Sequence, residues 1–154
     1  MSTSSSATTA ATPATTSFAG ISPNWSFVRA PATRRAACCT TPYTGQAIAF
    51  TRGPTTSEAV QIDHLVSLSD AWYKGARGWD DQRRRDFAND PRNLLAVAGQ
   101  ANFDKAFRDA TAWLPPNAAF RCEFVARQID VKAAYALWLS KNEKRAMEDV
   151  LARC

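Results

Sequence analysis

Two β-type runs and two helical stretches surround the single histidine of the chain, and their order limits the fold to mixed α and β structure. His64 directly follows Asp63 in the run 59–68, which is expected to form a strand. A helical insert separates this run from Leu94–Ala98, an apolar run typical of a short buried strand, and a helix is predicted over residues 101–109. Because the chain has one histidine, its imidazole chemistry is confined to this place.

The first 40 residues differ in composition from the remainder of the chain. Residues 1–20 are rich in Ser, Thr and Ala, and the first charged residue is Arg29. Such a segment buries too little apolar surface to offset its ordering entropy, so residues 1–40 are predicted to be a disordered tail and linker. The segment also lacks the basic and apolar regions of a secretory signal. Residues 41–154 are long enough for one domain with an ordinary core.

Turn and capping residues predict where other elements begin. The run Gln46–Arg52 alternates in a way that is compatible with a short strand. Ser69 or Asp70 is expected to cap a helix. The last helix is expected to open with a capping box, in which the Ser140 hydroxyl and the Glu143 carboxylate satisfy free amide groups reciprocally.

The charge balance favours an anionic partner without establishing one. The chain has 19 Lys and Arg against 14 Asp and Glu, which gives a net charge of +5. A moderate positive field helps to collect a polyanion such as a nucleic acid, although many basic proteins bind none. No apolar run reaches the ~20 residues that span a bilayer, so no membrane partner is expected.

Four cysteines allow three disulfide pairings. Cys122 and Cys154 lie on the last two predicted helices, and a disulfide between them would join these helices. Cys38 and Cys39 are adjacent and are poorly placed to bond each other. The lone histidine and the lack of a Cys-x-x-Cys pair argue against a structural zinc site. The even number of cysteines favours an oxidising compartment, in which they form disulfides; buried free thiols are the alternative.

The residues around the histidine include what phosphodiester hydrolysis requires. His64 suits the activation of a water near neutral pH. Asp63 and Asn102 offer oxygen ligands that leave most of a coordination sphere to water and phosphate, which suits Mg²⁺ and not Zn²⁺. Lys105 lies one helical turn beyond Asn102, in reach of a phosphate oxygen. Asn93 precedes the second strand and can tie the loop after His64 to it.

Each of these residues also has a purely structural interpretation. An Asp-His pair is more often a hydrogen-bonded structural pair than a catalytic one. Asn102 is suited to be a helix N-cap, Asn93 a turn residue, and Lys105 a solvated charge. The prediction of a site therefore depends on the order and spacing of all of them together.

The same residues carry a resemblance to a known family. The chain from about residue 42 to 154 resembles the HNH endonuclease family, in the branch related to the C-terminal domain of GmrSD-type restriction enzymes. The segments that carry the resemblance are Pro42-Tyr43-Thr44-Gly45, Val60-Gln61-Ile62-Asp63-His64, Asp70-Ala71-Trp72, Phe87-Ala88-Asn89-Asp90, Asn93-Leu94-Leu95-Ala96-Val97, Asn102-x-x-Lys105, Trp113-Leu114-Pro115-Pro116 and Arg121-Cys122.

The resemblance implies an α+β fold with a ββα-metal (His-Me finger) core and additional C-terminal helices. It implies that His64 is the general base and that Asp63 and Asn102 hold one divalent cation, Mg²⁺ or Mn²⁺. It further implies that Asn93 orients the base and that Lys105 contacts phosphate. The implied activity is endonucleolytic cleavage of DNA, with RNA as the other candidate, by a monomeric, extracellular protein.

Two departures from the family pattern stand next to the proposed phosphate contact. Relatives commonly continue after the lysine with Gly-Asp, whereas here Lys105 is followed by Ala106 and Phe107. Asp104 also places a negative charge directly before Lys105. An alternative interpretation is therefore a catalytically inactive HNH-fold module that binds DNA or protein. A third is a secreted structural domain held by Cys122 and Cys154.

Overall fold

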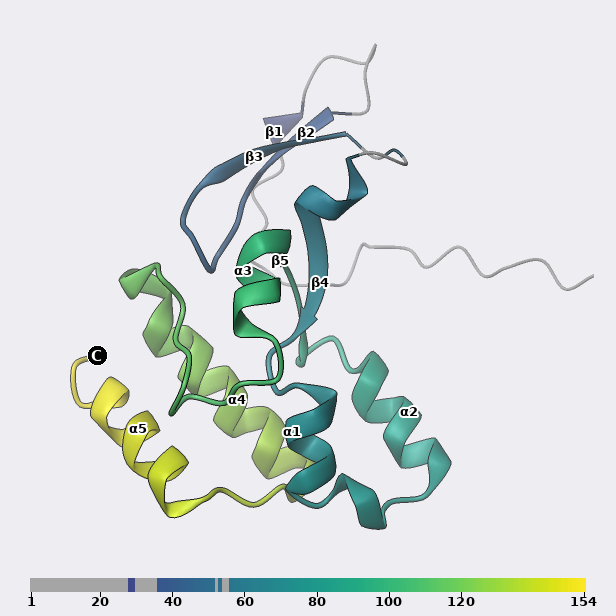
Figure 1. Cartoon of the computed structure of the whole chain (residues 1–154), viewed down its shortest axis with the longest axis vertical. Helices are drawn as coiled ribbons and strands as arrows, with labels where there is room; N and C mark the ends of the chain where they lie inside the picture. The colour runs from purple at the N-terminus through teal and green to yellow at the C-terminus, as the bar shows by residue number, and fades with distance from the viewer. Residues whose placement is uncertain (1–27, 30–35, 52, 54–55) are drawn as a thin grey trace, which may run out of the picture.

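The computed structural model describes residues 28–29, 36–51, 53 and 56–154, and within these it contains two small antiparallel sheets and five α-helices (Figure 1). The α+β class predicted from the sequence is confirmed. The strands are β1 Val28–Arg29, β2 Ala36–Thr40, β3 Ala47–Thr51, β4 Val60–His64 and β5 Leu94–Ala98. The helices are α1 Leu68–Tyr73, α2 Asp81–Asn89, α3 Gly99–Lys105, α4 Arg121–Tyr135 and α5 Lys141–Leu151, with short 3₁₀ turns η2 Ser57–Ala59, η3 Ala76–Gly78 and η4 Ala118–Phe120.

The first sheet has the strand order β1-β2-β3. β2 pairs antiparallel with β3, with Thr40 opposite Ala47 and Ala36 opposite Thr51. Part of the segment predicted to be a tail and linker therefore lies in β1 and β2; β1 has two residues, and the small residues of β2 carry no clear strand signal. The proposed boundary at residue 41 falls at the end of β2. Residues 1–27 and 30–35 lie outside the described part of the chain.

The second sheet and α3 form a strand-strand-helix unit, in which α1 and α2 lie between β4 and β5 along the chain. β4 and β5 are antiparallel, with His64 opposite Leu94 and Val60 opposite Ala98. α3 starts directly after β5 at Gly99, two residues before the predicted start. A Cβ at Gly99 would lie 2.0 Å from the Glu58 carbonyl oxygen, so only glycine allows α3 to begin this close to η2.

Helix α4 packs against both hydrophobic clusters of the described chain. One cluster contains Phe124 and Val125 of α4 with Tyr43 and Leu95, and it also includes Met147 of α5. The other places Val131 of α4 with residues of α1 and α2, namely Ala71 and Phe87. Burying these apolar faces is the main stabilising contribution to the arrangement of β4, β5 and α1 around α4.

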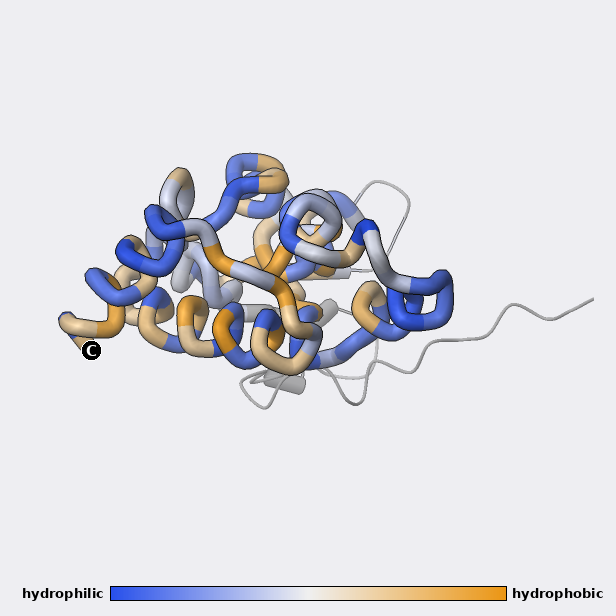
Figure 2. Tube along the Cα trace, turned by 90° about the horizontal axis from the view of Figure 1, so that it is seen from below, coloured by the Kyte–Doolittle hydropathy of each residue, from blue (hydrophilic) through white to orange (hydrophobic). Residues whose placement is uncertain are grey.

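The C-terminal hairpin of α4 and α5 is closed by a disulfide between Cys122 and Cys154. α5 buries Glu143, Met147 and Val150 on one side, and Figure 2 shows hydrophilic and hydrophobic residues alternating along it. Only half of the predicted capping box forms: Ser140 Oγ accepts from the Glu143 amide, whereas the Glu143 carboxylate binds two lysines instead. Among the described helices, none has the length and apolar character needed to cross a membrane.

Candidate active site

The turn that follows β4 is held by side chains from two other elements. The Val66 amide donates to Asn93 Oδ1 at 2.8 Å, and Asn93 Nδ2 donates to the Val66 carbonyl at 3.1 Å. Gln128 of α4 donates to the Leu65 carbonyl at 2.7 Å. Asn93 and Gln128 are both buried, so their bonds do not compete with water. The predicted tie between Asn93 and this turn is present, whereas Gln128 gave no sequence signal beyond its place on a helix.

His64 stands at the end of β4, half-buried, with its ring directed to the C-terminal end of α2. Its Nε2 lies 2.9 Å from the carbonyl oxygen of Ala88. Because a carbonyl can only accept, this contact requires a proton on Nε2. Neutral His64 then carries its lone pair on Nδ1, which is the form that a general base needs.

Asp63 is buried on the opposite side of the strand and is bound by two other residues. The Tyr43 hydroxyl donates to Oδ2 at 2.5 Å, and Lys105 Nζ lies 3.0 Å from Oδ1 and 2.9 Å from Oδ2. Burial, followed by the neighbouring Asp63 carboxylate, raises the pKa of Tyr43 well above its usual value, so this phenol stays a donor. Tyr43 lies in the Pro-Tyr-Thr-Gly segment, and the sequence pattern alone does not indicate its contact with Asp63.

Lys105 is fully buried, so the interpretation of this residue as a solvated charge is wrong. Besides Asp63, its ammonium binds the backbone carbonyl of His64 at 2.8 Å. Burial lowers the pKa of Lys105, and the nearby Asp63 carboxylate opposes this shift. The structure therefore brings Lys105 together with Asp63 and with the backbone of His64.

Asn102 faces β4 from the first turn of α3, where its Nδ2 donates to Gln61 Oε1 at 2.9 Å. It is not the N-cap, because Ala98 takes that position. Gln61 lies two residues before Asp63, so both side chains leave the same side of β4. Gln61, Asp63 and Asn102 thus supply oxygen atoms along the contact between β4 and α3, and the period-2 spacing of Gln61 and Asp63 is the signal that sequence reasoning missed.

The two departures from the family pattern have clear structural positions. The Asp104 carboxylate accepts from Gln100 Nε2 at 2.9 Å on the exposed side of α3, away from buried Lys105. Ala106 has φ 49° and ψ −125°, a backbone conformation that glycine adopts much more readily than alanine. This geometry fits the glycine that the family resemblance leads us to expect after Lys105.

A separate group of charges links α1, α4 and α5. The carboxylates of Asp70, Asp109 and Glu143 lie within 4.8 Å of one another. Lys74 Nζ contacts all three at 2.5 to 2.8 Å, and Lys132 Nζ contacts Asp70 at 2.7 Å and Glu143 at 2.6 Å. Burial disfavours the charged form of Lys74, but its hydrogen bonds to the carboxylates raise its pKa overall. Two ammonium groups already balance most of this negative charge, so we interpret the group as a structural ion network.

The described chain thus combines a two-strand-and-helix unit with a histidine that binds the end of α2 and a buried acid on the opposite side of β4. Residues 28–150 match the family described as GmrSD restriction endonucleases, C-terminal domain, and the chain belongs to that family. The chain is also 37% identical over 102 residues to an "Uncharacterized secreted protein" of Arthroderma benhamiae. This match covers 65% of the chain but 50% of the relative, so the chain spans about half the length of that protein.

Proposed function

We propose that the domain is a divalent-cation-dependent endonuclease that hydrolyses DNA phosphodiester bonds. The observation that carries the proposal is the placement of His64 at the end of β4, with Nε2 on the Ala88 carbonyl and the following turn held by Asn93. Membership of a nuclease-related family supports the same reaction class. The net charge of +5 is compatible with a polyanionic substrate.

In the proposed reaction His64 Nδ1 removes a proton from a water molecule as the water attacks phosphorus. The imidazolium keeps its Nε2 bond to Ala88, so the ring does not have to turn between protonation states. The bond to one ester oxygen breaks, and the leaving oxygen takes up a proton from solvent. Asn93 acts by positioning, because it fixes the turn that directly follows His64.

The residues expected to hold the cation are Asp63 and Asn102, and Gln61 Oε1 accepts a hydrogen bond from Asn102. A carboxylate and amide oxygens are the hard ligands that suit Mg²⁺ or Mn²⁺. Such an ion supplies charge stabilisation for the pentacoordinate phosphorus and the leaving oxygen. The Lys105 ammonium now neutralises Asp63, so cation binding has to compete with this pair, and released Lys105 is the proposed phosphate contact.

The test of the metal requirement is nicking of supercoiled plasmid with Mg²⁺ or Mn²⁺, beside EDTA. We expect cation-dependent nicking that Asp63→Asn abolishes and that Asp104→Asn leaves intact, because Asp104 is an exposed carboxylate on the outer side of α3. Nicking that proceeds in EDTA, or that survives Asp63→Asn, would show that the assigned ligands are wrong.

One observation favours the alternative of a catalytically inactive binding module. Asp63 is already paired with a buried lysine, as in a purely structural ion pair. The two proposals differ in cation uptake: the nuclease requires Mg²⁺ or Mn²⁺ binding that depends on Asp63, and the inactive module shows none in a calorimetric titration.

We further propose that the protein is extracellular and acts as a monomer. The secreted character of the Arthroderma benhamiae relative and the disulfide Cys122–Cys154 support an oxidising location. Detection of the protein in the medium of its source organism, with this disulfide formed, tests the location.

A further inference from the structure

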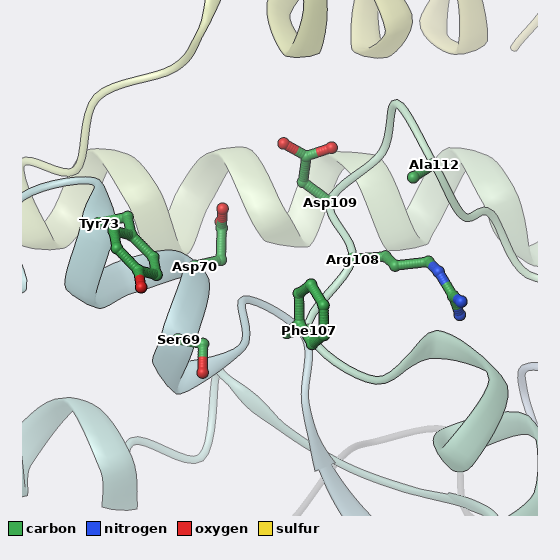
Figure 3. A pocket seen from close by; sticks show the side chains of 7 residues that line it. All are labelled: Ser69, Asp70, Tyr73, Phe107, Arg108, Asp109 and Ala112. Atoms are coloured by element: carbon green, nitrogen blue, oxygen red, sulfur yellow. The ribbon is translucent and has the colours of Figure 1, made fainter.

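A pocket of about 320 Å³ opens between α1 and the segment that follows α3. Figure 3 shows Tyr73 and Asp70 on the α1 side of the pocket and Phe107 and Asp109 on the other side, with Arg108 at one edge. Its volume falls within the ~300 to 1,000 Å³ range of small-ligand sites, and its accessible lining is mostly apolar. None of these pocket residues has a part in the reaction proposed above.

Two of the lining side chains are aromatic and unusually exposed. Tyr73 is 79% and Phe107 is 71% accessible to solvent. Large aromatic side chains are normally buried, so two of them at one pocket indicate a surface that is covered when a partner binds. Flat aromatic faces of this kind are the usual platforms for unpaired nucleic-acid bases.

The polar groups of the pocket fit the edge of a base and its flanking phosphate. Lys74 and Lys132 offset most of the negative charge of Asp70, Asp109 and Glu143, and the carboxylate oxygens of Asp70 and Asp109 at the pocket can accept further hydrogen bonds. Base amino groups can donate to such oxygens. Arg108 is exposed at the edge of the pocket and carries the positive charge that a phosphate requires.

Two short chain segments link the pocket to the candidate active site. Ser67, three residues after His64, caps α1 and donates through Oγ to the Phe107 carbonyl at 3.3 Å. Phe107 in turn follows Lys105 by two residues, and Lys105 binds the His64 carbonyl. A DNA strand bound at His64 would need to follow only these short segments to reach the pocket.

From these observations we infer that the pocket binds an unpaired base of a DNA strand, stacked on Tyr73 and Phe107, and so directs the enzyme to single-stranded or locally opened DNA. The inference rests on the proposed nuclease function for its choice of ligand. It extends that function by naming the form of the substrate and residues that select it.

The test is fluorescence anisotropy with a labelled single-stranded oligonucleotide and with the duplex of the same sequence, both in EDTA. We expect tighter binding of the single strand, weakened about tenfold by Tyr73→Ala and by Phe107→Ala, with duplex binding changed much less. Tyr73→Phe keeps the ring and should bind as the parent does. Phe103→Ala is the matched control, because Phe103 is 79% exposed on α3 but does not line the pocket.

Three results would overturn the inference. These are equal affinity for the single strand and the duplex, unchanged binding by both alanine variants, or an equal loss in Phe103→Ala. Cleavage is not required in EDTA, so a chain without nuclease activity still gives the expected binding result. Conversely, an active nuclease whose DNA binding is unchanged by Tyr73→Ala and by Phe107→Ala contradicts only the role inferred for the pocket.

Discussion

Asp63 and Lys105 form an ion pair almost fully removed from water, at the place where the proposed cation would bind. Each of the two charges needs the other, because an unpaired buried charge is strongly destabilising. Losing one partner is therefore expected to destabilise the fold, and under the proposed function the pair is expected to lower the affinity of Asp63 for a cation. Both effects are measurable at the level of single residues.

Lys105→Ala is expected to lower the free energy of unfolding by about 3 kcal/mol, because Asp63 loses its buried partner. The same change should make Mg²⁺ or Mn²⁺ raise the melting temperature more than in the parent protein, since the ion no longer competes with the ammonium. Thermal unfolding is measured without cation and at cation concentrations raised in ~10-fold steps through the millimolar range. These melting curves report both effects. An equal shift in parent and variant would show that no cation binds at Asp63.

Ala106→Gly is expected to stabilise the protein by about 1 kcal/mol, because alanine is strained at φ 49° and ψ −125° and glycine is not. Ala126→Gly in the exposed middle of α4 is the matched control and should destabilise by about 1 kcal/mol, since glycine weakens a helix interior. Urea unfolding of both variants measures whether the free energy of unfolding rises or falls in each. Destabilisation by Ala106→Gly would contradict the described backbone at this position.

At the scale of elements, the junction between α2 and β5 positions the histidine. The Ala88 carbonyl at the end of α2 accepts from His64, and Asn93 before β5 holds the turn after it. Asp90 stabilises this junction, because it accepts hydrogen bonds from Arg92 and from the Tyr135 hydroxyl of α4. Any loss of Asp90 contacts should therefore also affect the ring of His64.

The hydrogen bonds from Arg92, together with that from Tyr135, lower the pKa of Asp90 from 3.8 to about 2, although burial opposes the shift. A carboxylate whose folded pKa is depressed stabilises the fold above its unfolded pKa, and this contribution is lost as the pH falls from about 4 to 2. Asp90→Asn should cost about 1 to 2 kcal/mol at pH 6, allowing for the solvent exposure of Arg92, and much less at pH 2. Urea unfolding of the parent protein and of Asp90→Asn at both pH values tests this prediction. A loss of unfolding free energy that is the same at both pH values would contradict it.

At the scale of the whole molecule, the disulfide closes the C-terminal hairpin of α4 and α5, and Glu143 of α5 joins this hairpin to Lys74 at the end of α1. The bond closes a separation of 32 residues between Cys122 and Cys154. Reduction is expected to lower the free energy of unfolding by about 3 to 4 kcal/mol by the loop-entropy relation. Cys122→Ser with Cys154→Ser should give the same loss without reductant, measured by urea unfolding. Unchanged stability in that double variant would contradict the claim that the Cys122–Cys154 disulfide stabilises the fold.

The elements that could be predicted from the sequence are those with a local signal. β5 has the predicted limits, and β3 and β4 lie within the predicted runs, because alternation and apolar character are read from neighbouring residues. The contacts that build the site cannot be predicted from local patterns, because they join residues far apart in the sequence. Tyr43 binds Asp63 across 20 residues, and Gln128 binds Leu65 across 63. The same holds for Glu143, which the capping pattern assigned to its own helix but which Lys74 binds across 69 residues.

The most direct test of the central claim is chemical rescue of the base. The plasmid-nicking rate is measured in Mg²⁺ or Mn²⁺ for the parent protein and for His64→Ala, with and without added imidazole. If His64 is the general base, the variant loses activity by about a hundredfold or more, and imidazole restores part of the rate. A His64→Ala protein that nicks DNA as fast as the parent would contradict the assignment of the active site.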